Sequence, residues 1–217
     1  MDAAVAAAFT LSVVEPSMSG IGGRAQILIY TVDREVYGID ATTQAPAFYE
    51  FDDTLGVEYG YQTIAVPGVV KGLTDGLANF GDLPLEQVMK PAILYAQRGF
   101  ALLPGEAYRQ ESVKDILKEF TGTRQYYLNK DSTTKNAGHW IIQRDLARVL
   151  KSISEKGPDI FYKGWIAKAM VQDIRENGGF LTLKSLENYR AEQSHIVTGL
   201  SLIHISEPTR RYAISGG

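Results

Sequence analysis

The chain has 217 residues, of which 45% are hydrophobic and 22% are charged, and its formal net charge is -3. This balance excludes an intrinsically disordered chain and the basic footprint of a nucleic-acid-binding protein. The sequence contains no cysteine, which excludes disulfides, thiolate metal sites and cysteine nucleophiles.

The first part of the chain combines one helical signal with the clearest β signal. Residues 3–9 are rich in alanine and Pro16 marks a stop, so we expect a short helix that is packed on all sides. Residues 26–30 are continuously apolar, which predicts a strand covered on both faces. Residues 36–39 predict the returning strand of a hairpin whose turn lies at residues 33–34. This hairpin is the only clear β region.

Helical signals dominate after residue 65. Apolar side chains at helical spacing predict helices within residues 69–77, 113–120, 146–153 and 165–174. Pro91 is expected at a helix boundary or kink, and the polar residues 121–138 are expected to form a surface excursion. No apolar run reaches the roughly 18 residues that a membrane span requires. The pattern indicates an α+β chain.

An ordered set of short blocks resembles the γ-glutamyltranspeptidase family. The set opens with Asp2-Ala3-Ala4-Val5-Ala6-Ala7-Ala8-Phe9 and continues with Val14-Glu15-Pro16-Ser17-Met18-Ser19-Gly20-Ile21-Gly22-Gly23. Later blocks keep the family's order at residues 65–68, 72–73, 81–84, 91–93, 98–100, 145–150, 161–164, 178–179 and 181–190. The resemblance covers almost everything before Gly199, and its specificity comes from the order of the blocks.

The resemblance implies the αββα sandwich of N-terminal nucleophile hydrolases, incomplete in this chain. Residues 1–199 would be a partial large subunit, with a β-containing core portion at 1–65 and a mainly helical segment at 66–190. In the family a single precursor cuts itself in two, and a threonine at the start of the small subunit attacks a γ-glutamyl amide. Its own amine serves as the base, because a hydroxyl is a weak nucleophile until its proton is removed.

This chain would therefore lack the catalytic nucleophile and would be inactive by itself. The expected partners are the small subunit of the same precursor and a γ-glutamyl or related amide substrate, with no nucleic acid and no membrane. No cofactor is expected, and the three histidines share no metal-ligand spacing. The residues alone do not indicate a cellular compartment. The resemblance implies a periplasmic or extracellular protein.

One position departs from the family pattern. The block at residues 40–46 usually carries, at its third position, an arginine that grips the α-carboxylate of the substrate, and here that position is Thr42. Threonine lacks the charged two-pronged donor that suits a carboxylate. The antiparallel register of the hairpin places Arg24 roughly opposite Thr42 or Thr43. We hypothesise that Arg24 supplies the carboxylate donor; the alternative is a solvated or structurally paired arginine.

Two further functions stay open from the sequence. Thr42 favours a related acylase or amidohydrolase of the same superfamily, and a free-standing helical interaction module is the alternative outside the enzymes. Residues 200–210 do not continue the family pattern and resemble a translated sequencing adapter. We therefore expect residues 200–217 to be a non-native tail, and the start at Met1 to fall inside a family block.

Overall fold

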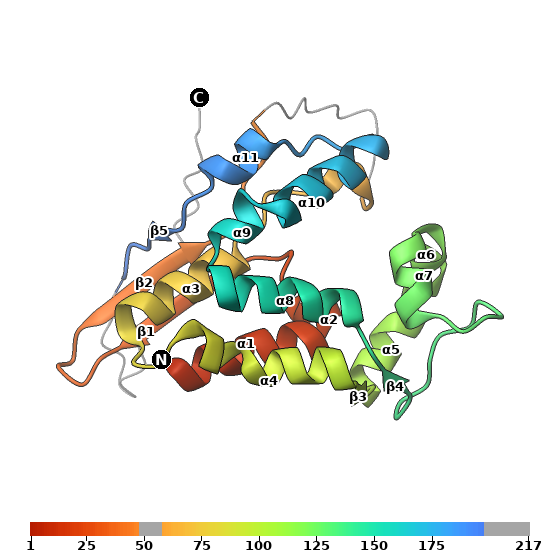
Figure 1. Ribbon diagram of the computed structural model, residues 1–217, viewed down its shortest axis with the longest axis horizontal. Coiled ribbons are helices and arrows are strands. Elements are labelled where there is room, and N and C mark those ends of the chain that lie inside the picture. Colours follow the sequence, from red (N-terminus) through yellow and green to blue (C-terminus); the bar gives the residue numbers. More distant parts are fainter. Residues whose placement is uncertain (48–57, 198–217) are drawn as a thin grey trace.

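The computed structural model describes residues 1–47 and 58–197 (Figure 1). The tail at residues 200–217 and its proposed origin lie outside the described residues. The helices are α1 (Asp2–Val14), α2 (Pro16–Ser19), α3 (Val69–Phe80), α4 (Leu85–Arg98), α5 (Pro104–Ser112), α6 (Lys114–Glu119), α7 (Thr121–Tyr127), α8 (Arg144–Lys156), α9 (Asp159–Tyr162), α10 (Trp165–Glu176) and α11 (Leu183–Asn188), with a 3-10 turn at Tyr61–Thr63. The strands are β1 (Ala25–Tyr30), β2 (Val36–Ala41), β3 (Phe100–Ala101), β4 (Trp140–Ile141) and β5 (Glu192–Gln193).

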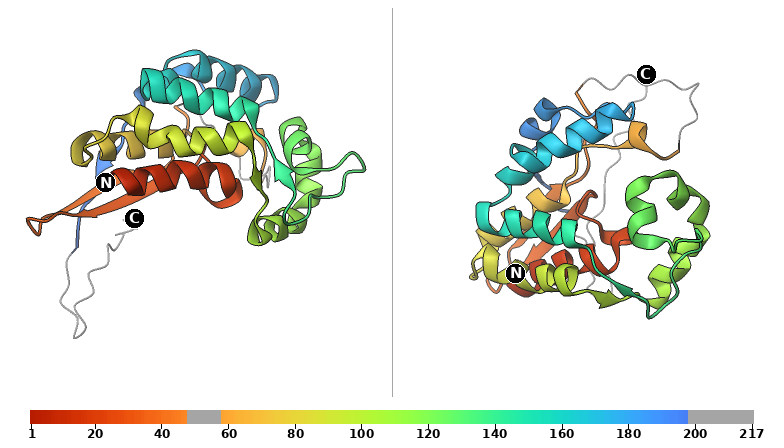
Figure 2. Two further views of the ribbon diagram at one scale, coloured as in Figure 1. Left: turned by 60° about the horizontal axis from the view of Figure 1, so that its bottom comes forward. Right: turned by 45° about the vertical axis from the view of Figure 1, so that its right-hand side comes forward.

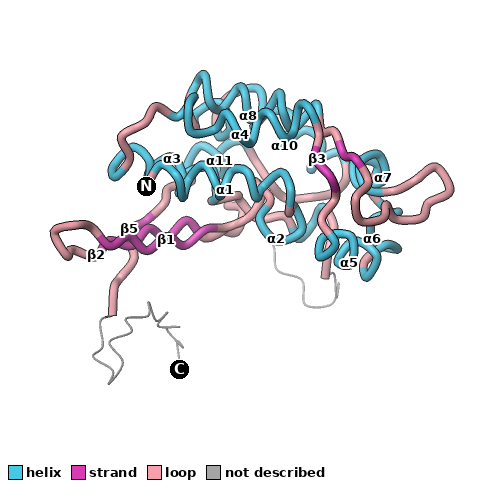
Figure 3. The backbone as a smooth tube through the Cα atoms, turned by 90° about the horizontal axis from the view of Figure 1, so that it is seen from below, coloured by secondary structure: helices cyan, strands magenta, loops and turns pink. Residues whose placement is uncertain are grey.

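The elements are stacked in layers above one sheet. Strands β1, β2 and β5 form an antiparallel sheet in that order. Helix α3 packs on β1 and β2, α1 packs against α3, and α4 lies between α1 and α8. Figure 3 shows the sheet on one side of α1 and α3, with α4 and α8 on the other. The mixed α+β architecture predicted from the sequence is confirmed.

The core joins the helical layers to one face of the sheet. Val5, Phe9 and Val13 of α1 are fully buried, and they recur at a spacing of four residues along one side of the helix. Ala3, Ala4 and Ala7 of the same helix are exposed. The prediction of a helix packed on all sides was therefore wrong, because among residues 1–47 and 58–197 only the side of α1 that faces the core is buried.

The hairpin pairs β1 with β2 in a register that joins Ala25 to Ala41 and Tyr30 to Val36. Burial alternates along β1: Leu28 is 42% exposed and Tyr30 is 68% exposed. The prediction that this strand is covered on both faces was wrong. A continuous apolar run occurs in strands with one covered face as well as in strands with two, so the run does not determine how many faces are covered. One face of the sheet packs on α3. On the other face the β1 side chains are exposed, while Gly38 of β2 is buried beside Ser194 and Ile196.

The second, smaller sheet and helices α5 and α7 were not anticipated, whereas α6 lies within the helix predicted at residues 113–120. Strands β3 and β4 pair through two residues each, so the hairpin is not the only β region. The polar stretch at residues 121–138 begins with helix α7 before it becomes irregular. Figure 2 shows the lobe of α5, α6 and α7 beside the end of the layered helices. Pro91 lies inside α4 and not at its boundary.

Glycine allows α3 to approach the hairpin closely. Gly68, Gly72 and Gly76 follow one another at four-residue spacing, so they share the side of the helix that faces the sheet. A Cβ atom added at Gly72 would lie 2.5 Å from the Cβ of Ala41, and one added at Gly68 would overlap the Ala41 carbonyl. The α3 backbone therefore lies against the Ala41 carbonyl at Gly68 and against the Ala41 methyl group at Gly72.

No helix within residues 1–47 or 58–197 has the length and apolar character that a membrane crossing requires.

We expect Gly72→Ala to destabilise the chain by about 1–3 kcal/mol, because the added methyl group overpacks the contact with Ala41. Gly122→Ala is the matched control, since a Cβ added at Gly122 meets no atom within 4 Å. Urea unfolding followed by circular dichroism measures both. Equal free energies of unfolding for the two variants would contradict the close packing of α3 on the hairpin.

Candidate functional site

The candidate site lies at the open end of the hairpin, where the glycine-rich turn enters β1 and the chain leaves β2. Since Ala25 pairs with Ala41, the next position of the same register places Arg24 opposite Thr42. Ala25 and Ala41 face α3, so strand alternation places Arg24 and Thr42 together on the open face of the sheet. The register is the one that the sequence predicts.

Arg24 is exposed, and no hydrogen bond or ion pair of its side chain occurs within residues 1–47 and 58–197. It borders a hollow of about 520 Å³ that lies between the glycine-rich turn and helices α1 and α3, and that is also lined by Leu11, Ser12, Val69 and Leu73, so this hollow is not on the open face of the sheet. Thr42 does not line this hollow. The structure thus places the two residues opposite each other without joining them in one closed pocket. An unpaired guanidinium can donate two parallel hydrogen bonds to the oxygens of a carboxylate.

Thr42 is held by its backbone. Its N–H donates to Asp40 Oδ1 at 3.0 Å, and its carbonyl oxygen accepts a hydrogen bond from the Tyr189 hydroxyl at 2.8 Å. The side chain is partly buried. These contacts fix the direction in which the chain leaves β2, so residue 42 has a defined position whatever side chain it carries.

Two stacked tyrosines support this strand end. The rings of Tyr162 and Tyr189 are 5.5 Å apart at an interplanar angle of 6°. The Tyr162 hydroxyl donates to the Pro67 carbonyl oxygen at 2.9 Å and accepts from the Lys71 N–H at 3.1 Å. The pair therefore links the exit of β2 to the start of α3. Sequence analysis missed both residues as site elements, although each lies in a block that resembles the family.

Burial raises the pKa of both phenols. For Tyr189 the pKa rises to about 12, with the carboxylate charges of Asp40 and Glu192 adding to the desolvation of the ring. The pKa of Tyr162 also rises, chiefly through desolvation. Both hydroxyls are therefore protonated near neutral pH, where they act as hydrogen-bond donors and not as bases.

The glycine-rich turn is fixed from two sides. The Gly23 carbonyl oxygen accepts hydrogen bonds from the N–H groups of Gly68 and Val69, at 2.9 and 3.2 Å. On the other side, the Ser17 hydroxyl donates to Glu106 at 2.6 Å. Glu106 is only 1% exposed, and it also accepts hydrogen bonds from Arg109 and Gln110. A buried carboxylate must be satisfied in this way, so the turn is tied both to α3 and to α5.

A guanidinium is the side-chain group best suited to bind a carboxylate. The site offers one charged donor, Arg24, beside a strand end that the tyrosine pair holds in place. The part of the chain that the structure describes holds no group of three or more His, Asp or Glu side chains that could bind a metal ion.

Comparison with known proteins gives one consistent result. The profile of the gamma-glutamyltranspeptidase family matches residues 1–208. A glutathione hydrolase proenzyme of Bacillus subtilis (strain 168) is 35% identical over 204 residues, covering 87% of this chain and 34% of that protein. An acylase ACY 1 proenzyme of Pseudomonas sp. (strain SE83) is 34% identical over 217 residues, covering 92% of this chain and 38% of that protein.

Comparison with solved structures finds a member of the same family. The crystal structure of Helicobacter pylori gamma-glutamyltranspeptidase superposes with a TM-score of 0.87 at 30% identity, covering 92% of this chain and 60% of that chain. The chain thus spans about a third of the length of the two curated relatives named above.

The tyrosine pair predicts how stability depends on alkaline pH. A phenol whose pKa is raised on folding stays protonated in the folded state after the unfolded chain has lost its proton. The two buried phenols therefore make their full contribution to the free energy of unfolding below about pH 10. This contribution falls as the pH rises from about 10 to about 12. Urea unfolding at a series of pH values measures the decline, and phenolate absorbance follows the ionisation.

Tyr189→Phe should reduce this alkaline decline and should also cost about 1 kcal/mol near neutral pH, because the Thr42 carbonyl loses its donor. Tyr108→Phe is the control, since Tyr108 is 77% exposed. If the native protein released all its phenol protons near pH 10, the buried tyrosine pair would be contradicted.

Proposed function

The chain belongs to the gamma-glutamyltranspeptidase family, and we propose that it supplies large-subunit residues of an enzyme that transfers or hydrolyses γ-glutamyl groups. The observation that carries the proposal is the family match over residues 1–208, with the same fold in the Helicobacter pylori enzyme. The fold is that of the N-terminal nucleophile hydrolases, as the sequence predicts.

In this proposal the nucleophile comes from outside the chain. A threonine at the start of the partner small subunit attacks the amide carbonyl, and its own amine takes the hydroxyl proton. The C–N bond breaks, the departing amine receives that proton, and an ester-linked acyl-enzyme remains. Water then releases the acyl group in hydrolysis, whereas an amino acid or peptide releases it in transpeptidation. Residues 1–199 would form the partial large subunit, and this chain without its partner would be inactive. The relatives' description as proenzymes supports a precursor that is processed.

The contribution of this chain would be to recognise the acyl donor. Arg24 is exposed and unpaired among the described residues, and it lies opposite the position where the family pattern carries an arginine. Its guanidinium would bind the α-carboxylate of a γ-glutamyl donor from the neighbouring strand. Thr42 would border the same donor with a small polar side chain.

A related acylase is the second candidate function, and Thr42 favours it. An acyl donor without an α-carboxylate has no need of the missing arginine. The 34% identity to the acylase ACY 1 proenzyme supports this alternative. A free-standing helical interaction module is the third candidate, and the match of residues 1–208 to one enzyme family weighs against it.

The two enzyme functions are separated by assaying the processed full-length protein on two anilides. One carries a γ-glutamyl group, and the other carries the same acyl chain without its α-amine and α-carboxylate. If the protein is a γ-glutamyl enzyme that uses Arg24, Arg24→Ala should raise KM for the γ-glutamyl anilide about tenfold, the loss expected for a charged hydrogen bond, with kcat little changed.

The anilide without the carboxylate is the internal control, because Arg24→Ala should leave its KM unchanged. Thr42→Arg in the Arg24→Ala background should lower KM for the γ-glutamyl anilide again. Preference of the unaltered protein for the second anilide would select the acylase. An equal rise in KM for both anilides in Arg24→Ala would show that Arg24 has only a structural role.

A further inference from the structure

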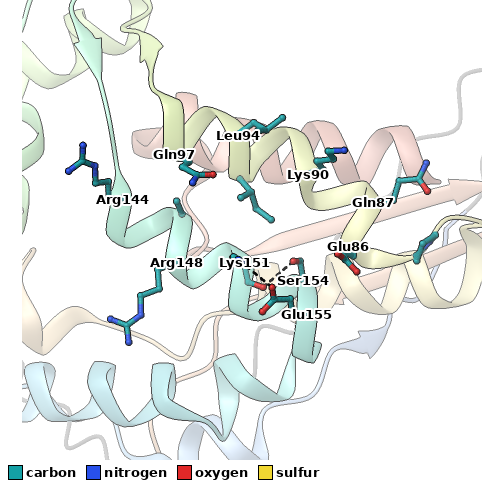
Figure 4. A pocket seen from close by; sticks show the side chains of 13 residues that line it. Glu86, Gln87, Lys90, Leu94, Gln97, Arg144, Arg148, Lys151, Ser154 and Glu155 are labelled. Carbon is teal, nitrogen blue, oxygen red and sulfur yellow. Dashed lines mark hydrogen bonds and ion pairs between the residues drawn. The ribbon is translucent and has the colours of Figure 1, made fainter.

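A groove runs along the outer surface of the helical layer, on the side away from the hairpin. It lies between α4 and α8, has a volume of about 1050 Å³, and is lined by Ile93, Leu94 and Ala147 among others. Figure 4 shows Lys90, Leu94 and Gln97 on α4 and Arg144, Arg148 and Lys151 along α8, with the Arg148 guanidinium pointing away from α4. A second hollow of about 550 Å³ adjoins it on the other flank of α4 and shares Gln87, Lys90 and Leu94.

Positive charge is concentrated on this surface although the chain has a net charge of -3. Five cationic side chains line the two hollows, against only the two carboxylates of Glu86 and Glu155. The cationic residues are Lys90, Arg98, Arg144, Arg148 and Lys151. A local excess of one sign on a chain of the opposite net charge favours a partner of complementary charge.

Most of these cations are free to bind. Lys151 pairs with Glu155 at 3.7 Å, and the Arg148 guanidinium lies 4.8 Å from the centre of the Trp165 ring. Within residues 1–47 and 58–197, the side chains of Lys90, Arg98 and Arg144 form no ion pair. The ring under Arg148 holds its guanidinium in place while leaving its donors available.

Apolar groups accompany the charge. Tyr95 is 47% exposed and Trp140 is 58% exposed, and both line the smaller hollow beside Pro91 and Leu94. Aromatic side chains with this much exposure are typical of contact surfaces, where they anchor a partner. The surface therefore combines an aromatic hollow with a row of cations.

We propose that this surface binds an acidic segment of a partner protein that presents one apolar side chain. Arg144, Arg148 and Lys151 lie one helical turn apart, so their row is about 10 Å long. Carboxylates spaced by one turn on an acidic helix match this row. The apolar side chain of the segment would enter the hollow of Tyr95 and Trp140, while Lys90, shared by both hollows, would hold a carboxylate between them.

The test uses the 217-residue chain and a capped helical peptide. The peptide carries glutamates at one-turn spacing and a single phenylalanine, and the control peptide has glutamine in place of each glutamate. Both tryptophans of the chain lie at this surface, Trp140 in the smaller hollow and Trp165 under Arg148. Peptides without tryptophan therefore allow binding to be followed by intrinsic fluorescence, and Trp140→Phe isolates the signal of Trp165.

We expect the acidic peptide to bind, the control peptide to bind at least tenfold more weakly, and the affinity to fall with added salt. Arg144→Glu and Lys90→Glu, on opposite sides of the groove, should each weaken binding about tenfold. Lys184→Glu changes the charge equally at an exposed position on α11 and should leave binding unchanged. Circular dichroism confirms that each variant is folded.

Three results would overturn the proposal. One is an acidic peptide that binds no better than its glutamine control. Another is an equal loss of binding in Lys184→Glu and Arg144→Glu. The third is sedimentation that shows the groove occupied by a second copy of the chain, with Lys90→Glu restoring the monomer.

Discussion

The close approach of α3 to the hairpin is the constraint on which the rest of the structure depends. Gly68 and Gly72 bring the helix backbone against Ala41, so that only the small Ala41 methyl group lies between Gly72 and the strand. The same helix start donates two hydrogen bonds to Gly23. One helix therefore sets the position of both strand ends and of the turn that precedes β1, and the opposition of Arg24 and Thr42 follows from that arrangement.

The polar supports of this arrangement come from distant parts of the chain. Tyr162 and Tyr189 join the start of α3 to the end of β2, and Glu106 joins α5 to Ser17 of α2, the short helix that precedes the glycine-rich turn. Each of these groups is nearly inaccessible to solvent and is hydrogen-bonded. Losing one partner would leave a buried polar group unsatisfied, so these contacts specify one geometry for the strand ends.

The molecule presents two separate surfaces. The open face of the sheet carries Arg24, Gln26, Leu28 and Tyr30, with apolar and polar side chains side by side. The groove between α4 and α8 lies on the opposite side of the helical layers and carries concentrated positive charge. Because α1, α3 and α4 separate the two, recognition of an acyl donor and binding of an acidic partner would use different residues of the same chain.

Local sequence determined the existence of most elements. Apolar periodicity located α3, α8 and α10, and glycines with positive φ end the last two regions at Gly157 and Gly178. The hairpin and its register also follow from local signals, because a short turn and a period of two leave few pairings. The ordered blocks led to the family, which the profile match over residues 1–208 confirms.

Only the tertiary structure decided which faces are covered and which distant residues meet. Strand β1 has one exposed face although its residues are mostly apolar, and α1 has exposed alanines on one side. The burial of a face depends on what packs against it and not on the composition of the element alone. The contacts of Tyr189 with Thr42 and of Glu106 with Ser17 span 147 and 89 residues. Neither pairing leaves a signal in local spacing, and the groove of cations arises only when α4 and α8 lie side by side.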